Sequence, residues 1–187
     1  MDVYDFDKTL YLGDSSVDFF LYCIRRYPTI LFDLPAIAWS MLLYAMRLRS
    51  KTRLKETFFR FVRRLKSTDS EVSAFWKERS DRFSGPCKPQ PGDMVISASP
   101  EFLLAPICSQ KGWKMIGSRV DPRNGRFDGE NCYGEEKVRR FAEVYPGREI
   151  NAFFSDSRSD LPLARYARHA FLVDRYEIRE WHQDEAV

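Results

Sequence analysis

The N-terminal segment carries two carboxylates at a spacing that suits phosphoryl chemistry. Asp5 and Asp7 follow a short β-like run, and Thr9 completes an Asp-x-Asp-x-Thr pattern. Side chains alternate along an extended chain, so the two carboxylates point to the same side. Adjacent carboxylates repel each other unless a cation or a shared proton neutralises them, and oxygen ligands suit Mg²⁺. The pattern predicts a magnesium-assisted aspartate nucleophile, and a strand end with solvated acids is the alternative.

The composition indicates a folded protein with an uneven charge distribution. The chain has 187 residues, of which 44% are hydrophobic, enough for one core and a small accessory domain. Residues 13–92 hold 15 of the 30 Lys and Arg residues but only 8 of the 27 Asp and Glu residues. An anionic partner is therefore expected to meet this region rather than the rest of the chain.

The cysteines and histidines show no metal-binding or nucleophilic pattern. Neither histidine, His169 or His182, has a serine or cysteine partner in the sequence pattern, so we expect both to be structural. The cysteine spacing favours four reduced thiols in a cytoplasmic protein, at Cys23, Cys87, Cys108 and Cys132.

Residues 13–92 are predicted to be helical. Capping-box patterns at 15–18 and 68–71 predict the start of two helices. Residues 34–46 form an uncharged run, which is shorter than the roughly 18 apolar residues of a membrane span and favours a buried or interfacial helix. Residues 47–66 hold nine basic residues and one acid beside an apolar helical face. This segment suits either a membrane surface or a solvated face over an ordinary core.

Strands and helices alternate after a Pro/Gly-rich linker at 85–92. This order predicts a parallel α/β sheet, which binds ligands beyond the carboxyl ends of its strands. Polar clusters at 5–9, 97–99 and 155–160 all follow predicted strands, so we expect one composite site. The predicted strands are 1–6, 94–96, 114–116, 150–154 and 170–173; the predicted helices are 101–111, 135–145 and 160–168, with a hairpin turn at Asn124–Gly125.

The chain holds four short motifs in order: Asp5/Asp7/Thr9, Ser97, Lys137 and Asp156/Asp160. This order resembles the haloacid dehalogenase superfamily of Mg²⁺-dependent phosphatases. The insertion before the second motif is similar to the helical cap of the phosphoserine-phosphatase-like branch, subfamily IB. The resemblance implies a Rossmann-like core of residues 1–12 and 93–187 with a helical cap of residues 13–92. Segments 134–138 and 155–163 resemble, more narrowly, the phosphatidylglycerophosphatase C type.

The resemblance also implies a role for each motif residue. Asp5 would be the nucleophile that forms an aspartyl-phosphate, and Asp7 would protonate the leaving alkoxide and then activate water. The implied phosphate-binding residues are Thr9, Ser97 and Lys137, with Ser99 as an equally placed hydroxyl. The implied Mg²⁺ ligands are Asp5, Asp7 and Asp156, and Asp160 is either a further ligand or a support for the metal site. The chain departs from the family at Lys8 and Ser155, where glycine is usual.

The sequence therefore predicts a phosphomonoesterase, with the substrate left open. A lipid phosphate such as phosphatidylglycerol phosphate fits the apolar, basic cap, and a small metabolite such as phosphoserine is the alternative. A third hypothesis is a membrane- or nucleic-acid-binding protein with an inactive phosphatase fold, against which the complete set of motif carboxylates argues. We expect no nucleic-acid partner and a cytoplasmic location, with peripheral contact between the cap and an anionic membrane as an open option.

Overall fold

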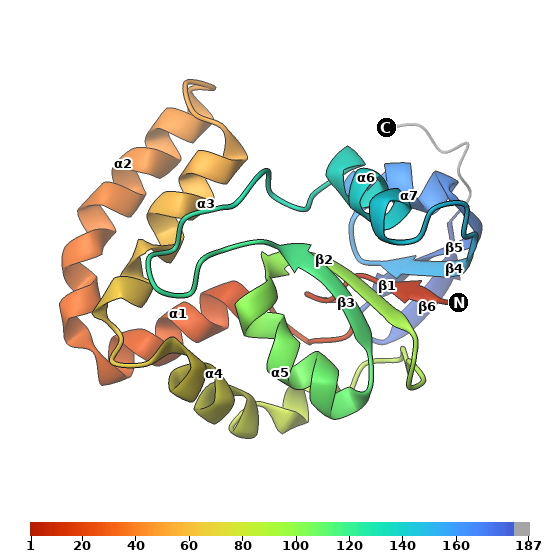
Figure 1. Cartoon of the computed structure of the whole chain (residues 1–187), viewed down its shortest axis with the longest axis horizontal. Coiled ribbons are helices and arrows are strands. Elements are labelled where there is room, and N and C mark those ends of the chain that lie inside the picture. Colours follow the sequence, from red (N-terminus) through yellow and green to blue (C-terminus); the bar gives the residue numbers. More distant parts are fainter. Residues whose placement is uncertain (182–187) are drawn as a thin grey trace.

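A six-stranded sheet organises the chain in the computed structural model, which describes residues 1–181 (Figure 1). The strand order is β3-β2-β1-β4-β5-β6, in which β1 to β5 are parallel and β6 is antiparallel to β5. The predicted parallel α/β sheet is confirmed, and the terminal strand β6 was not predicted. The bounds are β1 Val3–Tyr4, β2 Met94–Pro100, β3 Lys114–Ser118, β4 Ile150–Ser155, β5 Ala167–Asp174 and β6 Glu177–Glu180.

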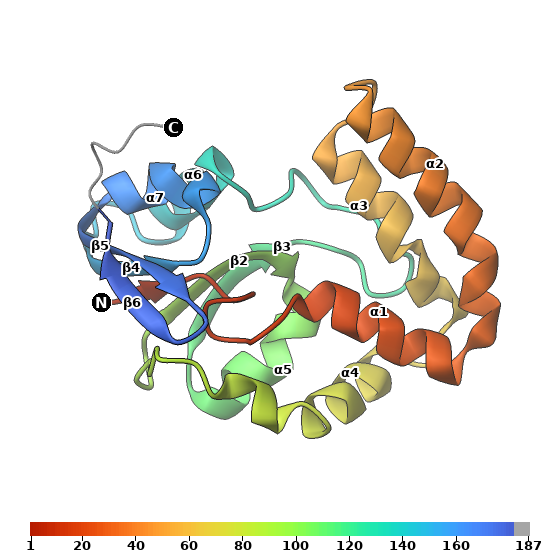
Figure 2. The same ribbon diagram turned by 180° about the vertical axis from the view of Figure 1, so that it is seen from behind.

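Helices cover both faces of this sheet, and the sheet separates two hydrophobic cores. Helix α5 (Glu101–Lys111) lies on one face, and α6 (Glu135–Val144) and α7 (Leu161–Arg165) lie on the other (Figures 1 and 2). Val3 packs into the core that contains Phe141, and Tyr4 packs into the core that contains Leu103. The two residues face different cores because successive side chains of a strand point to opposite faces of the sheet. The predicted helix at 160–168 is shorter in the structure, since a 3₁₀ turn at Arg158–Asp160 precedes α7.

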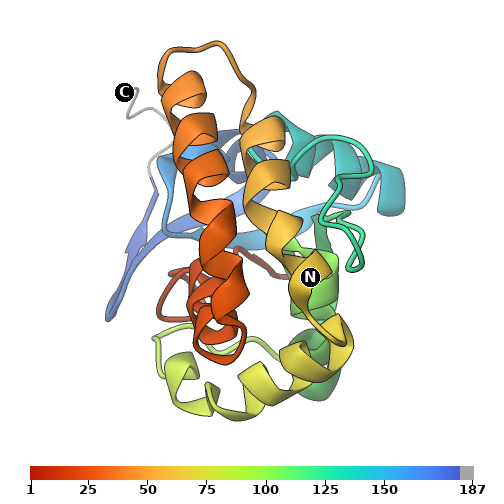
Figure 3. The ribbon, with the colours of Figure 1, turned by 90° about the vertical axis from the view of Figure 1, so that its left-hand side faces the viewer.

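A helical insertion (residues 13–92) joins β1 to β2. Within it, α2 and α3 lie side by side and extend away from the sheet, while α1 and α4 lie nearer to it (Figures 1 and 3). The elements are α1 Ser15–Arg26, η1 Pro28–Asp33, α2 Leu34–Ala45, α3 Lys51–Phe59, η2 Arg60–Arg64, α4 Thr68–Lys77 and η3 Ser80–Phe83.

The start of each predicted capping box is shifted by one residue. Asp14 caps α1 by accepting from Val17 N, and Ser67 caps α4 by accepting from Ser70 N. The backbone N–H of Ser15 instead donates to Asp7, which places the start of α1 at the carboxyl end of β1.

The basic segment 47–66 was predicted as one amphipathic element but is divided in the structure. Arg47 has a left-handed φ of 59° and Ser50 caps α3, so helix α3 begins only at Lys51. The predicted hairpin at Asn124–Gly125 is a turn closed by a single bridge between Val120 and Phe127, with no strands beside it.

Most of the apolar segment Pro28–Ala45 is exposed. By length and composition it could cross a membrane, yet only 17% of it is buried within the protein. The option of a buried helix is therefore wrong, because no other element covers most of its surface among residues 1–181. We call its exposed apolar residues and their neighbours the α2 surface: Leu31, Phe32, Leu34, Trp39, Met41, Leu42, Tyr44, Met46 and Leu48.

Candidate active site

The carboxyl ends of β1, β2 and β4 meet at a cavity of about 440 Å³ that also reaches the helical insertion. All the strand ends that the sequence singled out contribute polar side chains to its lining, and helices of the insertion close the opposite side. The polar lining includes Asp5, Asp7, Ser97, Ser99, Lys137, Asp156 and Asp160. The composite site predicted from separate motifs is thus assembled in space.

Lys137 lies at the centre of the buried charges. Its Nζ donates to Asp5 Oδ1 at 2.6 Å and to Asp160 Oδ2 at 2.7 Å. Burial alone would lower the pKa of Lys137, but the two carboxylates outweigh burial and raise that pKa above its ordinary value. Burial raises the pKa of Asp5, which Lys137 opposes. The ammonium is therefore a fixed positive charge beside the predicted nucleophile.

Asp7 is held in a defined orientation by two donors. Ser15 N donates to Asp7 Oδ1 at 2.7 Å, and Ser99 Oγ donates to Asp7 Oδ2 at 2.5 Å. Burial and the nearby Asp14 raise the pKa of Asp7 to about 6, while these hydrogen bonds act in the opposite direction. A carboxyl with such a pKa can both give and take a proton near neutral pH.

The two candidate serines and Thr9 have different surroundings. Ser97 lines the cavity and accepts a hydrogen bond from Ser99 N at 3.1 Å, which leaves its hydroxyl proton available to a ligand. The hydroxyl of Ser99, in contrast, donates its hydrogen bond to Asp7. Thr9 is fully buried, and its hydroxyl accepts from Asp156 N at 3.0 Å. Thr9 therefore supports the Asp156 loop and is not among the residues that line the cavity.

The carboxylates fit a hard cation in part. Within residues 1–181, no preformed group of three or more His, Cys, Asp or Glu side chains surrounds a metal position. Asp160 was expected either to bind the metal or to support its site, and it accepts hydrogen bonds from Lys137 and from Ser155 Oγ at 2.8 Å, as a supporting residue would. Asp5 and Asp156 both line the cavity, and burial raises the pKa of Asp156. Clustered carboxylates in a buried setting are a donor set that suits Mg²⁺.

Both departures from the family pattern have a local explanation. Lys8 adopts a φ of 61°, in the left-handed region that glycine enters without strain. Its backbone N–H donates to Tyr11 O at 2.7 Å, which holds this tight turn after Asp7. Ser155 supplies the hydroxyl that binds Asp160. Neither residue replaces a group that could take part in catalysis.

Sequence reasoning missed Lys55, which reaches the cavity from α3. Its Nζ donates to Ala98 O at 2.8 Å, between the two candidate serines. Burial lowers the pKa of Lys55 to about 8, with the charge of Asp7 opposing that shift. Lys55 is one of nine basic residues between 47 and 66, and nothing in their spacing distinguishes it.

Apolar side chains of the helical insertion form the other wall of the same cavity. They come from α1, α2 and α3, so the wall adjoins the α2 surface. The residues are Val17, Ile37, Met41, Leu54, Phe58 and Phe59. The sequence indicated Leu54 and Phe58 as part of an apolar helical face but gave no sign that this face would border the carboxylates.

Comparisons with known proteins agree with this architecture. The family model described as haloacid dehalogenase-like hydrolase matches residues 3–165. A "probable phosphatase" of Mycobacterium tuberculosis is 33% identical over 90 residues, which cover 43% of this chain and 31% of that protein. Protein CicA of Caulobacter vibrioides is 33% identical over 81 residues, which cover 40% of this chain and 36% of that protein. The chain spans about a third of the length of these curated relatives.

Solved structures share the fold at low sequence identity. A protein of unknown function from Bordetella pertussis Tohama I has a TM-score of 0.66 at 20% identity, covering 91% of this chain and 87% of that one. A "probable phosphoserine phosphatase" from Vibrio cholerae has a TM-score of 0.54 at 11% identity, covering 90% of this chain and 55% of that one. Identities this low establish a common fold only.

Proposed function

The chain belongs to the haloacid dehalogenase-like hydrolases, and from this premise we propose that it is a Mg²⁺-dependent phosphomonoesterase for an amphipathic phosphate ester. One observation carries the proposal: Lys137 joins Asp5 and Asp160 in a cavity whose opposite wall is apolar. The Asp5 carboxylate can attack a phosphoryl group, and the Lys137 ammonium can neutralise the negative charge of that group. The apolar wall can hold the organic part of the substrate.

In the proposed reaction, Asp5 is the nucleophile and Asp7 transfers the protons. A carboxylate oxygen of Asp5 attacks phosphorus, and the bond from phosphorus to the leaving alcohol oxygen breaks. Asp7 gives its proton to that oxygen. It then takes a proton from the water that attacks the aspartyl-phosphate, which releases inorganic phosphate and restores both aspartates.

The remaining residues bind and neutralise charge. Lys137 offsets the negative charge of the phosphoryl group, and the Ser97 hydroxyl donates to a phosphoryl oxygen. Mg²⁺, held by Asp5, Asp156 and the backbone carbonyl of Asp7, would supply further charge neutralisation during transfer. Asp160 and Ser155 keep the ammonium of Lys137 in place.

The apolar wall favours a lipid phosphate over phosphoserine as substrate. Ile37 and Met41 line the cavity from α2, the helix that also presents Trp39 and Leu42 to solvent. A helix that is apolar on all sides and little covered is suited to lie at a lipid interface beside basic residues. Lipid phosphates such as phosphatidylglycerol phosphate combine a phosphomonoester with acyl chains that such an interface would hold.

Phosphate release from a substrate panel tests the function. The panel holds phosphatidylglycerol phosphate in mixed micelles, lysophosphatidate, phosphoserine and an aryl phosphate, each with Mg²⁺ and with EDTA. We expect release that requires Mg²⁺, is lost in Asp5→Asn and is fastest with the lipid substrates. Fastest release from phosphoserine would refute the lipid proposal alone, and the absence of release from every substrate would argue for an inactive fold.

The α2 surface provides a separate test of the lipid proposal. The double variant Trp39→Ser/Leu42→Ser changes residues that point away from the cavity, and Val144→Ser on α6 is an exposed apolar control. We expect the double variant to sediment less with anionic vesicles and to hydrolyse micellar lipid more slowly, with aryl phosphate hydrolysis unchanged. Equal vesicle binding by all three chains would contradict the role of this surface.

A further inference from the structure

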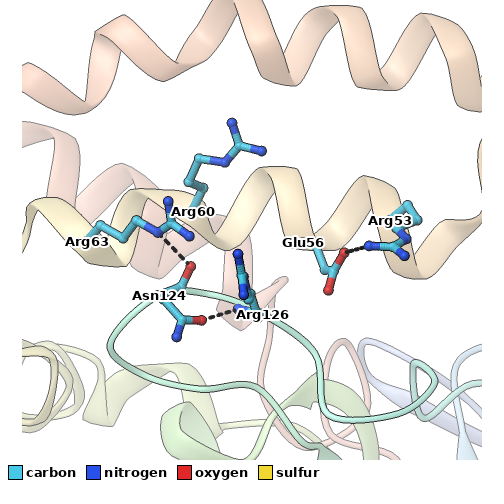
Figure 4. Close-up of a pocket in the computed structure, with 6 residues that line it drawn as sticks. All are labelled: Arg53, Glu56, Arg60, Arg63, Asn124 and Arg126. Atoms are coloured by element: carbon cyan, nitrogen blue, oxygen red, sulfur yellow. Dashed lines mark hydrogen bonds and ion pairs between the residues drawn. The ribbon is translucent and has the colours of Figure 1, made fainter.

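A second cavity, of about 540 Å³, lies between the α3–η2 segment and the loop that follows β3 (Figure 4). Four arginines surround it, and it shares no lining residue with the catalytic cavity. Arg53, Glu56, Arg60 and Arg63 recur at helical spacing, which puts them on one side of the segment. The complete lining is Arg53, Glu56, Arg60, Arg63, Asn124 and Arg126, which we call the arginine cavity.

Most of the positive charge in the arginine cavity has no carboxylate partner. Arg53 is paired with Glu56 at 3.0 Å, and the other oxygen of Glu56 accepts from Phe127 N at 3.2 Å. Arg63 Nε donates to the uncharged Asn124 O at 3.2 Å. The guanidinium groups of Arg60 and Arg126 make no hydrogen bond or ion pair with any residue from 1 to 181. Three of the four guanidinium groups that line the cavity therefore have no carboxylate partner among residues 1–181.

The loop beneath these arginines is firmly attached to the helical insertion. Gly125 has a φ of 74°, and a Cβ at this position would lie 2.3 Å from Phe59 O, so the two backbones are in close contact. Asp121 accepts from Asn124 Nδ2 at 2.6 Å, and Thr68 Oγ1 donates to Pro122 O at 2.7 Å. These contacts fix the backbone that carries Arg126, which reduces the ordering required when a ligand binds.

We propose that the arginine cavity binds a compact polyphosphate anion, either free or as the headgroup of a lipid. A guanidinium presents paired donors that match phosphate oxygens, and three of them can engage neighbouring phosphate groups. All six lining residues have polar or charged side chains, which suits phosphate groups. Because the catalytic residues take no part, the proposal does not rest on the phosphatase function.

Calorimetric titration with inorganic tripolyphosphate tests whether the arginine cavity binds a free polyphosphate. The full-length Asp5→Asn chain serves as the background, so that hydrolysis does not contribute heat. In this background, Arg60→Gln/Arg126→Gln should weaken binding about tenfold or more through the loss of charged hydrogen bonds. The control Arg25→Gln/Arg148→Gln removes the same charge from exposed positions outside the cavity and should bind within about twofold of the background.

Vesicle flotation of the same variants tests whether the arginine cavity binds a lipid headgroup. Phosphatidylcholine vesicles with and without phosphatidylinositol bisphosphate are the probes. Binding in either assay that depends on Arg60 and Arg126 supports the proposal and identifies the source. If neither probe binds the background chain, or if the Arg60/Arg126 variant binds as tightly as the control, the proposal is overturned. Circular dichroism of each variant excludes unfolding as the cause of lost binding.

Discussion

Lys137 Nζ lies within 2.7 Å of both Asp5 Oδ1 and Asp160 Oδ2, so one buried ammonium connects the carboxyl ends of β1 and β4. The two contacts join the predicted nucleophile near the N-terminus to a residue late in the sequence, which the motif suggested as a metal ligand or as a support for the metal site. It makes the stability of the site and its chemistry depend on the same side chain.

Replacing Lys137 with methionine should therefore destabilise the protein as well as inactivate it. The change leaves two buried carboxylates without their cation, which typically costs about 3–5 kcal/mol. Asp160→Asn keeps the contact between Lys137 and Asp5 and should cost about 1–2 kcal/mol. Urea unfolding in EDTA measures both free energies. Equal stability of Lys137→Met and the unmodified chain would show that the ion pairs do not hold the site together.

The two serines at the end of β2 should affect different kinetic constants. Ser99→Ala removes the 2.5 Å hydrogen bond to Asp7 and should lower kcat about tenfold, with partial rescue by Ser99→Thr. Ser97→Ala removes a proposed phosphate donor and should weaken inhibition by orthovanadate more than Ser99→Ala does. Steady-state kinetics and vanadate titration of the three variants separate these roles. Identical profiles for the two alanine variants would contradict the division.

Lys55 should make substrate binding depend on pH near 8. Burial lowers its pKa to about 8, so its positive charge is present below that pH and is lost above it. The KM for an anionic substrate should therefore rise as the pH increases through 8. Lys55→Arg keeps the charge and should shift this rise to higher pH, whereas Lys55→Met should raise KM below pH 8 and remove the dependence. An unchanged pH profile in Lys55→Met would exclude Lys55 from substrate binding.

Gly125 should tolerate no side chain. Alanine there would combine a left-handed backbone with a Cβ 2.3 Å from Phe59 O, and we expect a loss of about 3 kcal/mol or more in the free energy of unfolding. Gly147 is the matched control, since its φ is 70° but nothing lies within 4 Å of an added Cβ. Gly147→Ala should cost only about 1 kcal/mol. Equal losses in thermal or urea unfolding would mean that the loop moves freely away from α3.

The sequence was most informative where chemistry and strand ends coincide. The motifs at Asp5, Ser97, Lys137 and Asp156 were predicted to meet, and the structure brings them to one cavity because parallel strands share a carboxyl edge. For Thr9 and Asp160, the motif letters do not reveal which neighbour engages the side-chain oxygens. Their hydroxyl and carboxylate are engaged by Asp156 N and Lys137, contacts that only the folded backbone defines.

The helical insertion was less predictable for a different reason. Hydrophobic periodicity shows which residues avoid water but not which element covers them, so the exposure of α2 could not be foreseen. Lys55 could not be distinguished from the other basic residues of its segment, because its contact with Ala98 O depends on how α3 approaches β2. The strand β6 was missed since its residues are exposed and mostly charged.

The composition of β6 also bears on how copies of this chain would meet. Its four residues, Glu177 to Glu180, are all exposed, and three of them are charged. Charged side chains on an edge strand oppose the addition of a strand from another molecule, because like charges would be brought into register. Self-association through this edge of the sheet is therefore disfavoured, and oligomers formed in dilute buffer should instead bury the α2 surface and disperse when a mild detergent is added.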